Sequence, residues 1–271
     1  MLLGTWLRHD DAVAGSLSRE QPLQIAGWNA IPGLAHGFYG RRGGVSRGGY
    51  AELNLSRHVG DQADAVRENW RRISRNAGDA VRFVTMRQVH GAHVVTVDAA
   101  GEDAGEADAL ATREAGIGLS VLTADCVPIL LVAPQHGVIA AVHAGWRGTL
   151  QGIAPRAVHH LQQAFGVGAE AMQAALGPAI GGCCYEVSAT IVDELERRWG
   201  AMSDAVSRRG ASAAQLDLRA ANAAQLAASG VRSVDIVMVG PCTRCAGVEY
   251  FSHRAAQGDT GRQLSFVAWR P

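Results

Sequence analysis

The sequence predicts an α/β fold in which one or more mixed sheets are flanked by helices, built as a single domain over residues 1–271. Segments that are apolar on both faces, such as Ile117–Thr123, alternate with segments whose apolar residues recur at helical spacing, such as residues 64–77. No internal repeat, low-complexity linker or sharp change of composition divides the chain. At 271 residues, 48% of them hydrophobic, the chain is long enough to bury a substantial core.

The first half of the chain predicts mainly strands. Residues 1–35 look irregular apart from a short strand, and a glycine- and arginine-rich loop follows. Residues 64–77 place apolar side chains at helical spacing between arginines, which indicates a surface helix. Three later segments are apolar on both faces, as expected of buried strands. The expected strands are Leu23–Trp28, Arg82–Val89, His93–Val97, Ile117–Thr123, Pro128–Ala133 and Gly137–His143, and the loop is Arg41–Gly49.

The second half alternates helices with strands. A long helix is expected over Thr149–Phe165, where apolar residues keep a helical period. Further helices are expected at about 188–199 and 215–229, and strands near 172–177, 233–239 and 263–268. This order of elements is typical of α/β proteins.

Charge and composition exclude several classes of function. The 25 basic and 25 acidic residues balance, and no run of like charge indicates a nucleic-acid or membrane partner. Every basic residue is arginine, which excludes Schiff-base chemistry, lysine-held pyridoxal phosphate and the lysine-containing P-loop. An anion in the site would therefore be held by arginine or by backbone N–H groups.

The cysteines and the apolar runs predict a cytoplasmic location. Five cysteines, two of them adjacent, indicate reduced thiols rather than a disulfide framework. Met1–Asp11 reaches acidic residues too early for a signal peptide. The longest apolar runs are strand-sized and too short to cross a bilayer.

Three residues at the ends of expected strands form a candidate metal site. Cys126 precedes His143 by 17 residues, and His90 lies upstream. Two imidazoles and a thiolate are a natural zinc set, and three protein ligands leave one coordination position for water or substrate. Because α/β proteins place sites where strands open into loops, these side chains can meet at one sheet edge. The alternative is three unrelated polar residues near strand ends.

Asp125 and the remaining cysteines carry further alternatives. Asp125 is a candidate catalytic residue that either orients a ligand histidine or acts as a general base, and otherwise it is a turn residue that caps the strand end. Cys183-Cys184 and Cys242-Thr-Arg-Cys245 suggest a four-cysteine zinc site. The first pair is vicinal rather than spaced as in zinc ribbons, so buried thiols are the preferred interpretation.

Ten segments in order, spanning residues 36 to 262, resemble the laccase-domain (YfiH-like) family, also described as multicopper polyphenol oxidase-like or purine nucleoside phosphorylase proteins. The segments are His36–Ser46, Leu53–Leu55, His58–Asp61, Arg87–Gly91, Ala107–Ala109, Thr123–Cys126, Val142–Thr149, Gly177–Gly181, Cys242-Thr243 and Thr260–Arg262.

The resemblance implies a single-domain α/β fold, similar to that of cysteine hydrolases, and one zinc ion per chain held by His90, Cys126 and His143. It implies phosphorolysis of adenosine, inosine, guanosine and methylthioadenosine by inorganic phosphate, and deamination of adenosine, with Asp125, Cys126 and His143 as catalytic candidates. Arginines inside the matched segments, Arg41, Arg87 and Arg147, are candidates for phosphate or ribose contacts. Asn54 and Gln88 can hydrogen-bond a base or ribose, or equally cap backbone.

Two other functions remain open from the sequence. A metal-free hydrolase or amidase would use Cys126 as nucleophile and His143 as base on a peptide or cell-wall precursor. A copper-binding polyphenol oxidase is disfavoured because the ten histidines include no His-x-His pair, although copper can bind a His₂Cys site adventitiously. The chain is expected to be a monomer or a homodimer.

Overall fold

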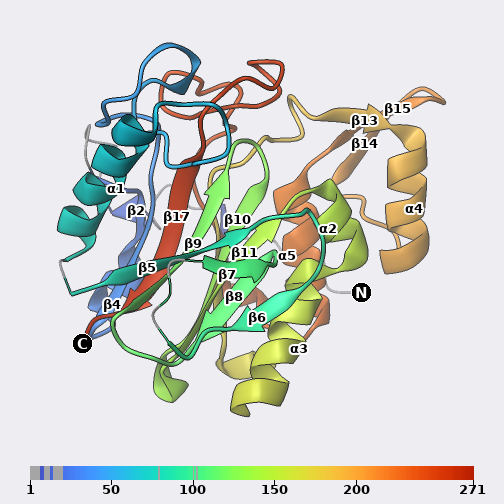
Figure 1. Ribbon diagram of the computed structural model, residues 1–271. Helices are drawn as coiled ribbons and strands as arrows, with labels where there is room; N and C mark the ends of the chain where they lie inside the picture. Colours follow the sequence, from blue (N-terminus) through green and yellow to red (C-terminus); the bar gives the residue numbers. More distant parts are fainter. Residues whose placement is uncertain (1–6, 9–12, 15–20, 79, 100, 102) are drawn as a thin grey trace.

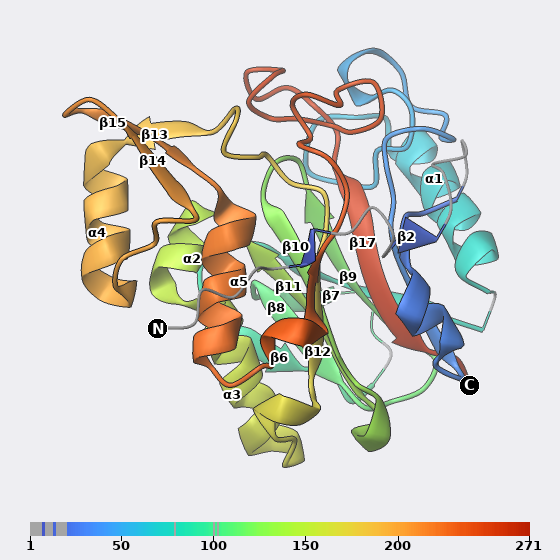
Figure 2. The same cartoon turned by 180° about the vertical axis from the view of Figure 1, so that it is seen from behind.

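A computed structural model describes residues 7–8, 13–14, 21–78, 80–99, 101 and 103–271 (Figures 1 and 2). Two large sheets pack face to face, with helix α1 (Ala63–Ala77) outside one sheet and helices α3 (Ile153–Phe165) and α5 (Leu218–Ala228) outside the other. The predicted α/β class with mixed sheets is confirmed. The assignment of residues 1–271 to one domain stays a prediction. Among the described residues, no helix is long and apolar enough to cross a membrane.

The larger sheet has seven strands and mixes parallel and antiparallel pairs. Strand β10 pairs antiparallel with β11 and β12, whereas β12 pairs parallel with β16. The strand order is β1 (Leu7–Arg8), β16 (Ile236–Met238), β12 (Gln173–Leu176), β10 (Val127–Ala133), β11 (Val138–Ala144), β8 (Ala109–Thr112) and β6 (Val94–Thr96).

The second large sheet has five strands, and two small sheets complete the set. Its order is β4 (Leu34–Phe38), β17 (Gln263–Trp269), β9 (Ile117–Thr123), β5 (Arg82–Arg87) and β7 (Asp103–Glu106). The small sheets are β13 (Glu186–Ser188), β15 (Ala213–Leu216) and β14 (Val206–Arg209), and β2 (Val13–Ala14) with β3 (Gln24–Ile25). The helices are α1 (Ala63–Ala77), α2 (Trp146–Gln151), α3 (Ile153–Phe165), α4 (Ala189–Trp199) and α5 (Leu218–Ala228).

Strand β10 shows why the central segments are apolar on both faces. Ile129 and Leu131 belong to the core cluster between the seven-stranded sheet and its helices. Leu130 and Val132 point the other way, into the core between the two sheets. Successive side chains of a strand alternate between faces, so both sets must be apolar. The prediction of a strand buried on both faces is confirmed.

Two expected helices differ from those observed. The helix over Thr149–Phe165 is broken into α2 and α3 at Gly152, whose φ is +79°. The last expected helix starts at Leu218, not 215, because the Asp217 side chain accepts from the N–H groups of Arg219 and Ala220. The residues before Asp217 form strand β15 instead.

The sequence analysis did not predict several of the strands that the structure contains. Strand β4 lies where the sequence looks irregular or unassigned, and the expected strand at Leu23–Trp28 is limited to β3, followed by a 3₁₀ turn over Ala26–Ala30. Strand β8 has the sequence Ala-Leu-Ala-Thr, which is too short and too small to give a clear periodic signal. Most of Met1–Asp11, on which the expected lack of a signal peptide rests, lies outside the described residues.

The chain passes from the five-stranded sheet to the seven-stranded sheet three times in succession. Strands β5, β7 and β9 belong to the five-stranded sheet, and each is followed by a strand of the seven-stranded sheet. Because β5 runs parallel to both β7 and β9, the carboxyl ends of all three strands lie on the same side of the sheet, and the three connections start there. The connections are residues 88–93, 107–108 and 124–126, and each carries a side chain of the site described next.

Candidate metal centre and its cavity

The crossings bring the three candidate ligands together. His90 lies in the first connection and Cys126 in the third, while His143 lies near the end of β11. Their ligand atoms all lie within 4.8 Å of one another. The rings of His90 and His143 meet edge to face, with centroids 4.9 Å apart. Three residues separated by up to 53 positions in the sequence therefore form one compact group.

The backbone around these ligands is unusual in three places. His90 and Asp125 have positive φ values of 60° and 88°, which few residues other than glycine adopt. Such conformations cost energy and cluster at functional sites. A Cβ atom at Gly145 would lie 3.0 Å from both Cys126 Sγ and His90 Cδ2, so only glycine allows the chain to pass this closely.

Asp108, in the second connection, organises the site, and the sequence analysis missed this role. Its buried carboxylate accepts hydrogen bonds from the backbone N–H groups of His90 at 3.0 Å and Gly91 at 2.6 Å. It also lies 2.8 Å from Nδ1 of His143. The structure thus gives the histidine-orienting contact to Asp108 rather than Asp125. The sequence did carry one indication of this role: Asp108 is an acidic residue that stands between two alanines just before a buried strand.

The charges of this group depend on one another. Burial alone would raise the pKa of Cys126, but His143 and His90 outweigh it and lower the pKa to about 6. Burial alone would lower the pKa of His143, but Cys126 and Asp108 raise it to about 9. Cys126 is therefore a thiolate at neutral pH, which is the form that binds metals or attacks as a nucleophile.

Asp125 lies beside Cys126 with its carboxylate fixed by two contacts. Thr243 Oγ1 donates to Oδ1 at 2.6 Å, and the backbone N–H of Arg254 donates to Oδ2 at 2.7 Å. Asp125 is 8% exposed and borders the cavity next to the candidate metal ligands.

A cavity of about 710 Å³ opens over these residues. Its volume lies within the usual range for small-molecule sites. Its walls combine arginine and histidine side chains with two aromatic rings and one acidic group, Asp125. Besides the candidate ligands His90 and His143, the basic and aromatic residues are His58, Arg87, Arg147, His253, Arg254 and Arg262, with Trp146 and Tyr185. This lining suits an anion together with a flat, partly apolar ligand.

Three of the five expected substrate-binding residues border the cavity: Arg87, Gln88 and Arg147. Arg87 forms an ion pair with Glu106, with Nη2 2.8 Å from Oε1. Arg147 is exposed on α2, and its guanidinium stacks 4.5 Å from the centre of the Trp146 ring. Gln88 also borders the cavity, but its amide donates to Leu122 O and accepts from Leu122 N–H, both at 2.8 Å. Gln88 therefore caps backbone, which was the alternative open for it.

The other two expected substrate-binding residues do not border the cavity. Arg41 donates to Ala51 O at 2.6 Å and Gly247 O at 3.1 Å, and stacks over Phe251. Asn54 is fully buried, and its amide bonds Asp61 and the backbone of Ser56. Both side chains connect loops behind the cavity.

The donor set fits a zinc ion. Asp108 engages Nδ1 of His143, which leaves Nε2 of that ring as its donor atom, and a buried carboxylate behind a ligand histidine is the usual supporting contact of zinc sites. The set of imidazole, thiolate and imidazole matches three-ligand sites that keep one position open.

The other four cysteines also come together, although they were expected to be buried thiols. The Sγ atoms of Cys183, Cys184, Cys242 and Cys245 lie within 4.8 Å of one another. The expectation is wrong for Cys183 and Cys245, which are exposed. The turns that carry them place the sulfurs side by side at the surface, which spacing in the sequence does not reveal.

Known proteins resemble this chain over most of its length. Purine nucleoside phosphorylase YlmD of Geobacillus stearothermophilus is 39% identical over 249 residues, covering 88% of this chain and 91% of the relative. Adenosine deaminase RL5, from an unknown prokaryotic organism, is 39% identical over 232 residues, covering 82% and 88%. The expectation of an enzyme is confirmed at the level of the family by these relatives.

Solved structures share the fold. The crystal structure of YlmD from G. stearothermophilus superposes with a TM-score of 0.89 and 35% identity, covering 96% of this chain and all of the other. Bacillus licheniformis hypothetical protein YfiH gives the same TM-score and coverage at 28% identity. The family model described as multi-copper polyphenol oxidoreductase laccase matches residues 35–270. The chain therefore belongs to this laccase-like family, together with YlmD and YfiH.

Proposed function

We propose that the protein is a zinc-dependent enzyme of purine nucleosides, which phosphorolyses adenosine, inosine, guanosine and methylthioadenosine and deaminates adenosine. The observation that carries the proposal is the His90–Cys126–His143 group at the base of a cavity lined by arginines and aromatic rings. The names of the relatives YlmD and RL5 support the two activities. The free cysteines suit a reducing cytoplasm.

His90, Cys126 and His143 would hold the metal, and Asp108 would fix the orientation of His143. A zinc ion held by three ligands supplies Lewis-acid stabilisation of charge and an activated water. Asp125, the acidic residue beside Cys126, would accept and return the proton that moves during deamination at C6 of adenine. Its contacts to Thr243 and Arg254 keep the carboxylate in place for that step.

The cavity walls would bind the two substrates. Arg147, exposed beside Trp146, is the proposed phosphate contact, because a planar guanidinium binds phosphate through two hydrogen bonds. Trp146 and Tyr185 offer ring faces on which a purine can stack. Holding phosphate near the ribose C1′ would bring the reacting atoms together, which is a large part of catalysis for a two-substrate reaction.

The test combines metal analysis with a turnover screen of freshly purified protein. Nucleosides are supplied with and without phosphate, so that phosphorolysis and deamination are measured separately. His90→Ala, Cys126→Ala and His143→Ala are each expected to reduce metal content and abolish turnover. His136→Ala, at an exposed turn far from the site, is the matched control. Full activity of metal-depleted wild-type protein would refute the zinc requirement.

A metal-free cysteine hydrolase is the second candidate, and one observation favours it. Cys126, His143 and Asp108 supply a thiolate, a protonated imidazole paired with it, and an orienting carboxylate, which is the ion-pair form of an activated cysteine nucleophile. This arrangement leaves His90 without a role, whereas the metal uses all three ligands.

Alkylation separates the two candidates. A metal-bound Cys126 is shielded and should react slowly with iodoacetamide until the metal is chelated, whereas a free catalytic thiolate reacts at once. Peptide mass mapping is needed because four other cysteines also react. Rapid labelling of Cys126 in native protein, together with amide hydrolysis, would establish the hydrolase instead.

A further inference from the structure

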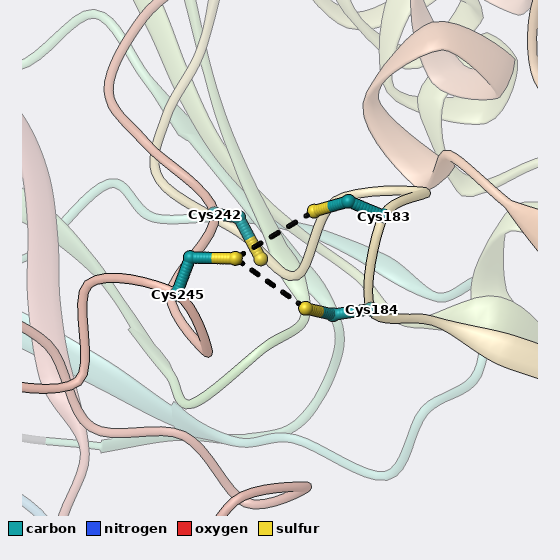
Figure 3. Close-up of side chains that lie close together, drawn as sticks. All are labelled: Cys183, Cys184, Cys242 and Cys245. Carbon is teal, nitrogen blue, oxygen red and sulfur yellow. Dashed lines mark hydrogen bonds between the residues drawn. The ribbon is translucent and has the colours of Figure 1, made fainter.

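Four cysteines form a second cluster of candidate ligands, separate from the metal centre described above. Cys183 and Cys184 come from one loop, and Cys242 and Cys245 from another (Figure 3). Their sulfurs turn toward one another, with Sγ–Sγ distances of 3.8 Å between Cys183 and Cys245 and 3.4 Å between Cys184 and Cys245. We propose that this cysteine cluster binds a structural zinc ion. The proposal does not depend on the activity at His90, Cys126 and His143.

The distances fit a tetrahedral metal site. Zinc–sulfur bonds of about 2.3 Å place the sulfurs of a tetrahedral site about 3.8 Å apart. The sulfurs in the cluster lie within 4.8 Å of one another. The Cys183–Cys245 distance of 3.8 Å equals the tetrahedral value, and the Cys184–Cys245 distance of 3.4 Å is slightly shorter. A disulfide would need sulfurs about 2.05 Å apart. All five cysteines are free thiols in the structure.

The local backbone explains how a vicinal pair serves as two ligands. The N–H groups of Cys184 and Tyr185 both donate to Gly181 O, at 2.9 and 3.0 Å, which closes a tight turn around Cys183 and Cys184. On the other loop, Ala246 N–H donates to Cys242 O at 2.9 Å and closes the Cys-x₂-Cys turn that zinc sites commonly use. Two turns therefore present two thiols each.

A glycine lets the two turns approach. A Cβ atom at Gly181 would lie 3.3 Å from Cys242 Cβ and 3.4 Å from Cys183 Sγ, closer than most real contacts. The Gly181 N–H instead donates to Cys242 Sγ at 3.2 Å. The two loops are further joined by an isolated bridge between Ala179 and Cys242.

The surroundings can offset the charge of such a site. Four thiolates around Zn²⁺ carry a net charge of −2, and binding releases the thiol protons to solvent. The Cys242 sulfur receives N–H groups from Gly181, Arg244 and Cys245. The Arg244 guanidinium adds a positive charge near the cluster, where Nη1 lies 3.5 Å from Cys184 O. Backbone donors and one arginine thus face the excess negative charge.

The ligand type selects the metal and its role. Four thiolates favour zinc over hard cations such as magnesium or calcium. Four protein ligands leave no open position, so the ion would be structural rather than catalytic.

A metal here would clamp the loops that hold Asp125. Thr243, between Cys242 and Cys245, donates from Oγ1 to Asp125 Oδ1 at 2.6 Å. Ile180, just before the vicinal pair, donates its N–H to Asp125 O at 2.9 Å. Thr243 is adjacent to Cys242, and Ile180 lies three residues before Cys183, so each loop of the cluster also holds a contact to Asp125. Zinc would join these loops at the rear of the cavity.

Native mass spectrometry and elemental analysis of the full chain, purified with zinc, test the proposal. Wild-type protein is expected to carry one zinc ion in the cysteine cluster whatever the state of the other site. Cys126→Ala should keep that ion, and Cys183→Ser with Cys245→Ser should lose it. Hydrogen exchange at residues 181–185 and 242–250 should increase when it is lost. Failure of the other zinc site would leave these results unchanged.

A second variant covers the case in which the serine variant does not fold. Cys245→His retains a ligand of the Cys₃His type and is expected to keep the zinc ion. In wild-type protein, the four cluster thiols should resist iodoacetamide until a chelator removes the ion. Three results would each overturn the proposal. The Cys126→Ala protein could carry no metal, or the cluster could hold iron in place of zinc. The intact mass could also be lower by two hydrogens because a disulfide joins two cluster cysteines.

Discussion

At the scale of single residues, Asp108 links the ring of His143 to the backbone at His90 in the candidate metal centre. Its carboxylate holds the His143 ring at Nδ1 and the backbone N–H groups around His90. Burial alone would raise the pKa of Asp108, but His143 and the backbone donors outweigh burial and lower it. The carboxylate therefore stays ionised where it contacts two candidate ligands, and Asp108 is not among the residues that line the cavity.

Asp108→Asn should weaken zinc binding. The amide cannot accept the same set of hydrogen bonds, so His143 loses its orienting anion and the His90 loop loses a fixed acceptor. Loss of such a supporting group typically costs about 10- to 100-fold in metal affinity. Chelator competition measures this, with the exposed Asp98→Asn as control. Equal affinities in the two variants would show that Asp108 does not support the metal.

Arg147→Ala should raise the KM for phosphate more than the KM for nucleoside. Loss of a charge-assisted hydrogen bond costs roughly 1.5–3 kcal/mol, or roughly 10- to 100-fold in KM. Initial rates at varied phosphate measure the change. Arg156→Ala, an exposed arginine on α3, is the matched control. An unchanged phosphate dependence would remove Arg147 from the anion site.

His36 should make the protein less stable as pH falls from about 6.5 to about 4. The ring is 1% exposed and accepts the Ile25 N–H at Nε2, and burial lowers its pKa from 6.5 to about 4. Between these values the unfolded chain binds a proton that the folded protein does not, so the free energy of unfolding decreases as the pH drops. Above pH 6.5 the His36 ring is neutral in both the folded and the unfolded protein, so it no longer makes the free energy of unfolding depend on pH.

The decrease in the free energy of unfolding that is due to His36 should reach roughly 3 kcal/mol at about pH 4 and below. Urea unfolding at a series of pH values measures it. His36→Gln keeps an acceptor for Ile25 but does not titrate, so the difference between variant and wild type isolates His36 from the other histidines. Parallel pH profiles for the two proteins would contradict the assignment.

At the scale of elements, the break between α2 and α3 depends on both conformation and packing. Gly152 ends α2 with a left-handed φ of +79°. A Cβ atom there would lie 2.5 Å from Cζ2 of Trp199 on α4. The glycine thus lets α4 pack against the start of α3 while the chain changes direction.

Gly152→Ala should destabilise the protein more than Gly166→Ala. Both glycines end helices with left-handed φ values, +79° and +69°, so both substitutions carry a similar backbone cost of roughly 1–2 kcal/mol. Nothing lies within 4 Å of the Cβ position at Gly166, whereas Gly152 would also meet Trp199, at a further cost of roughly 1–3 kcal/mol. Thermal or urea unfolding measures the difference. If both variants lose the same free energy of unfolding, the Trp199 side chain can move away from the new methyl group without cost.

At the scale of the whole molecule, strand β10 connects the two main cores. Leu130 packs between the sheets, and its neighbour Leu131 packs against the helices. The three crossings between the sheets join the same two layers through the backbone. This continuity supports the prediction that residues 1–271 fold as one domain.

Leu130→Ala and Leu161→Ala should each lower the midpoint of one shared unfolding transition. Leu130 lies between the sheets and Leu161 on α3, so they report on different cores. Each truncation should cost roughly 2–5 kcal/mol. Far-ultraviolet circular dichroism and tryptophan fluorescence should shift together in both variants. Two separate transitions, each affected by one variant, would contradict a single cooperative unit.

Local sequence patterns were sufficient to predict the α/β class and the central buried strands, and they singled out three candidate ligands. These features depend on local pattern and residue chemistry: Ile117–Thr123 must be a strand because both its faces are apolar, and Cys126 with two histidines is a metal set wherever it forms. The ordered motifs also indicated the laccase-like family, which is confirmed. Short strands such as β8 gave too weak a periodic signal.

Which distant residues come into contact could be read only from the three-dimensional arrangement of the strands and loops. Asp108 joins the site because the three connections start at the same ends of parallel strands. No local sequence pattern shows that these connections come together. The same holds for Arg41 and Asn54, which lie in matched motifs yet bond loops behind the cavity. The vicinal cysteines become neighbours of Cys242 and Cys245 through two turns that approach at Gly181. Proximity between distant segments depends on strand order and loop packing, whereas sequence spacing reports only on local geometry.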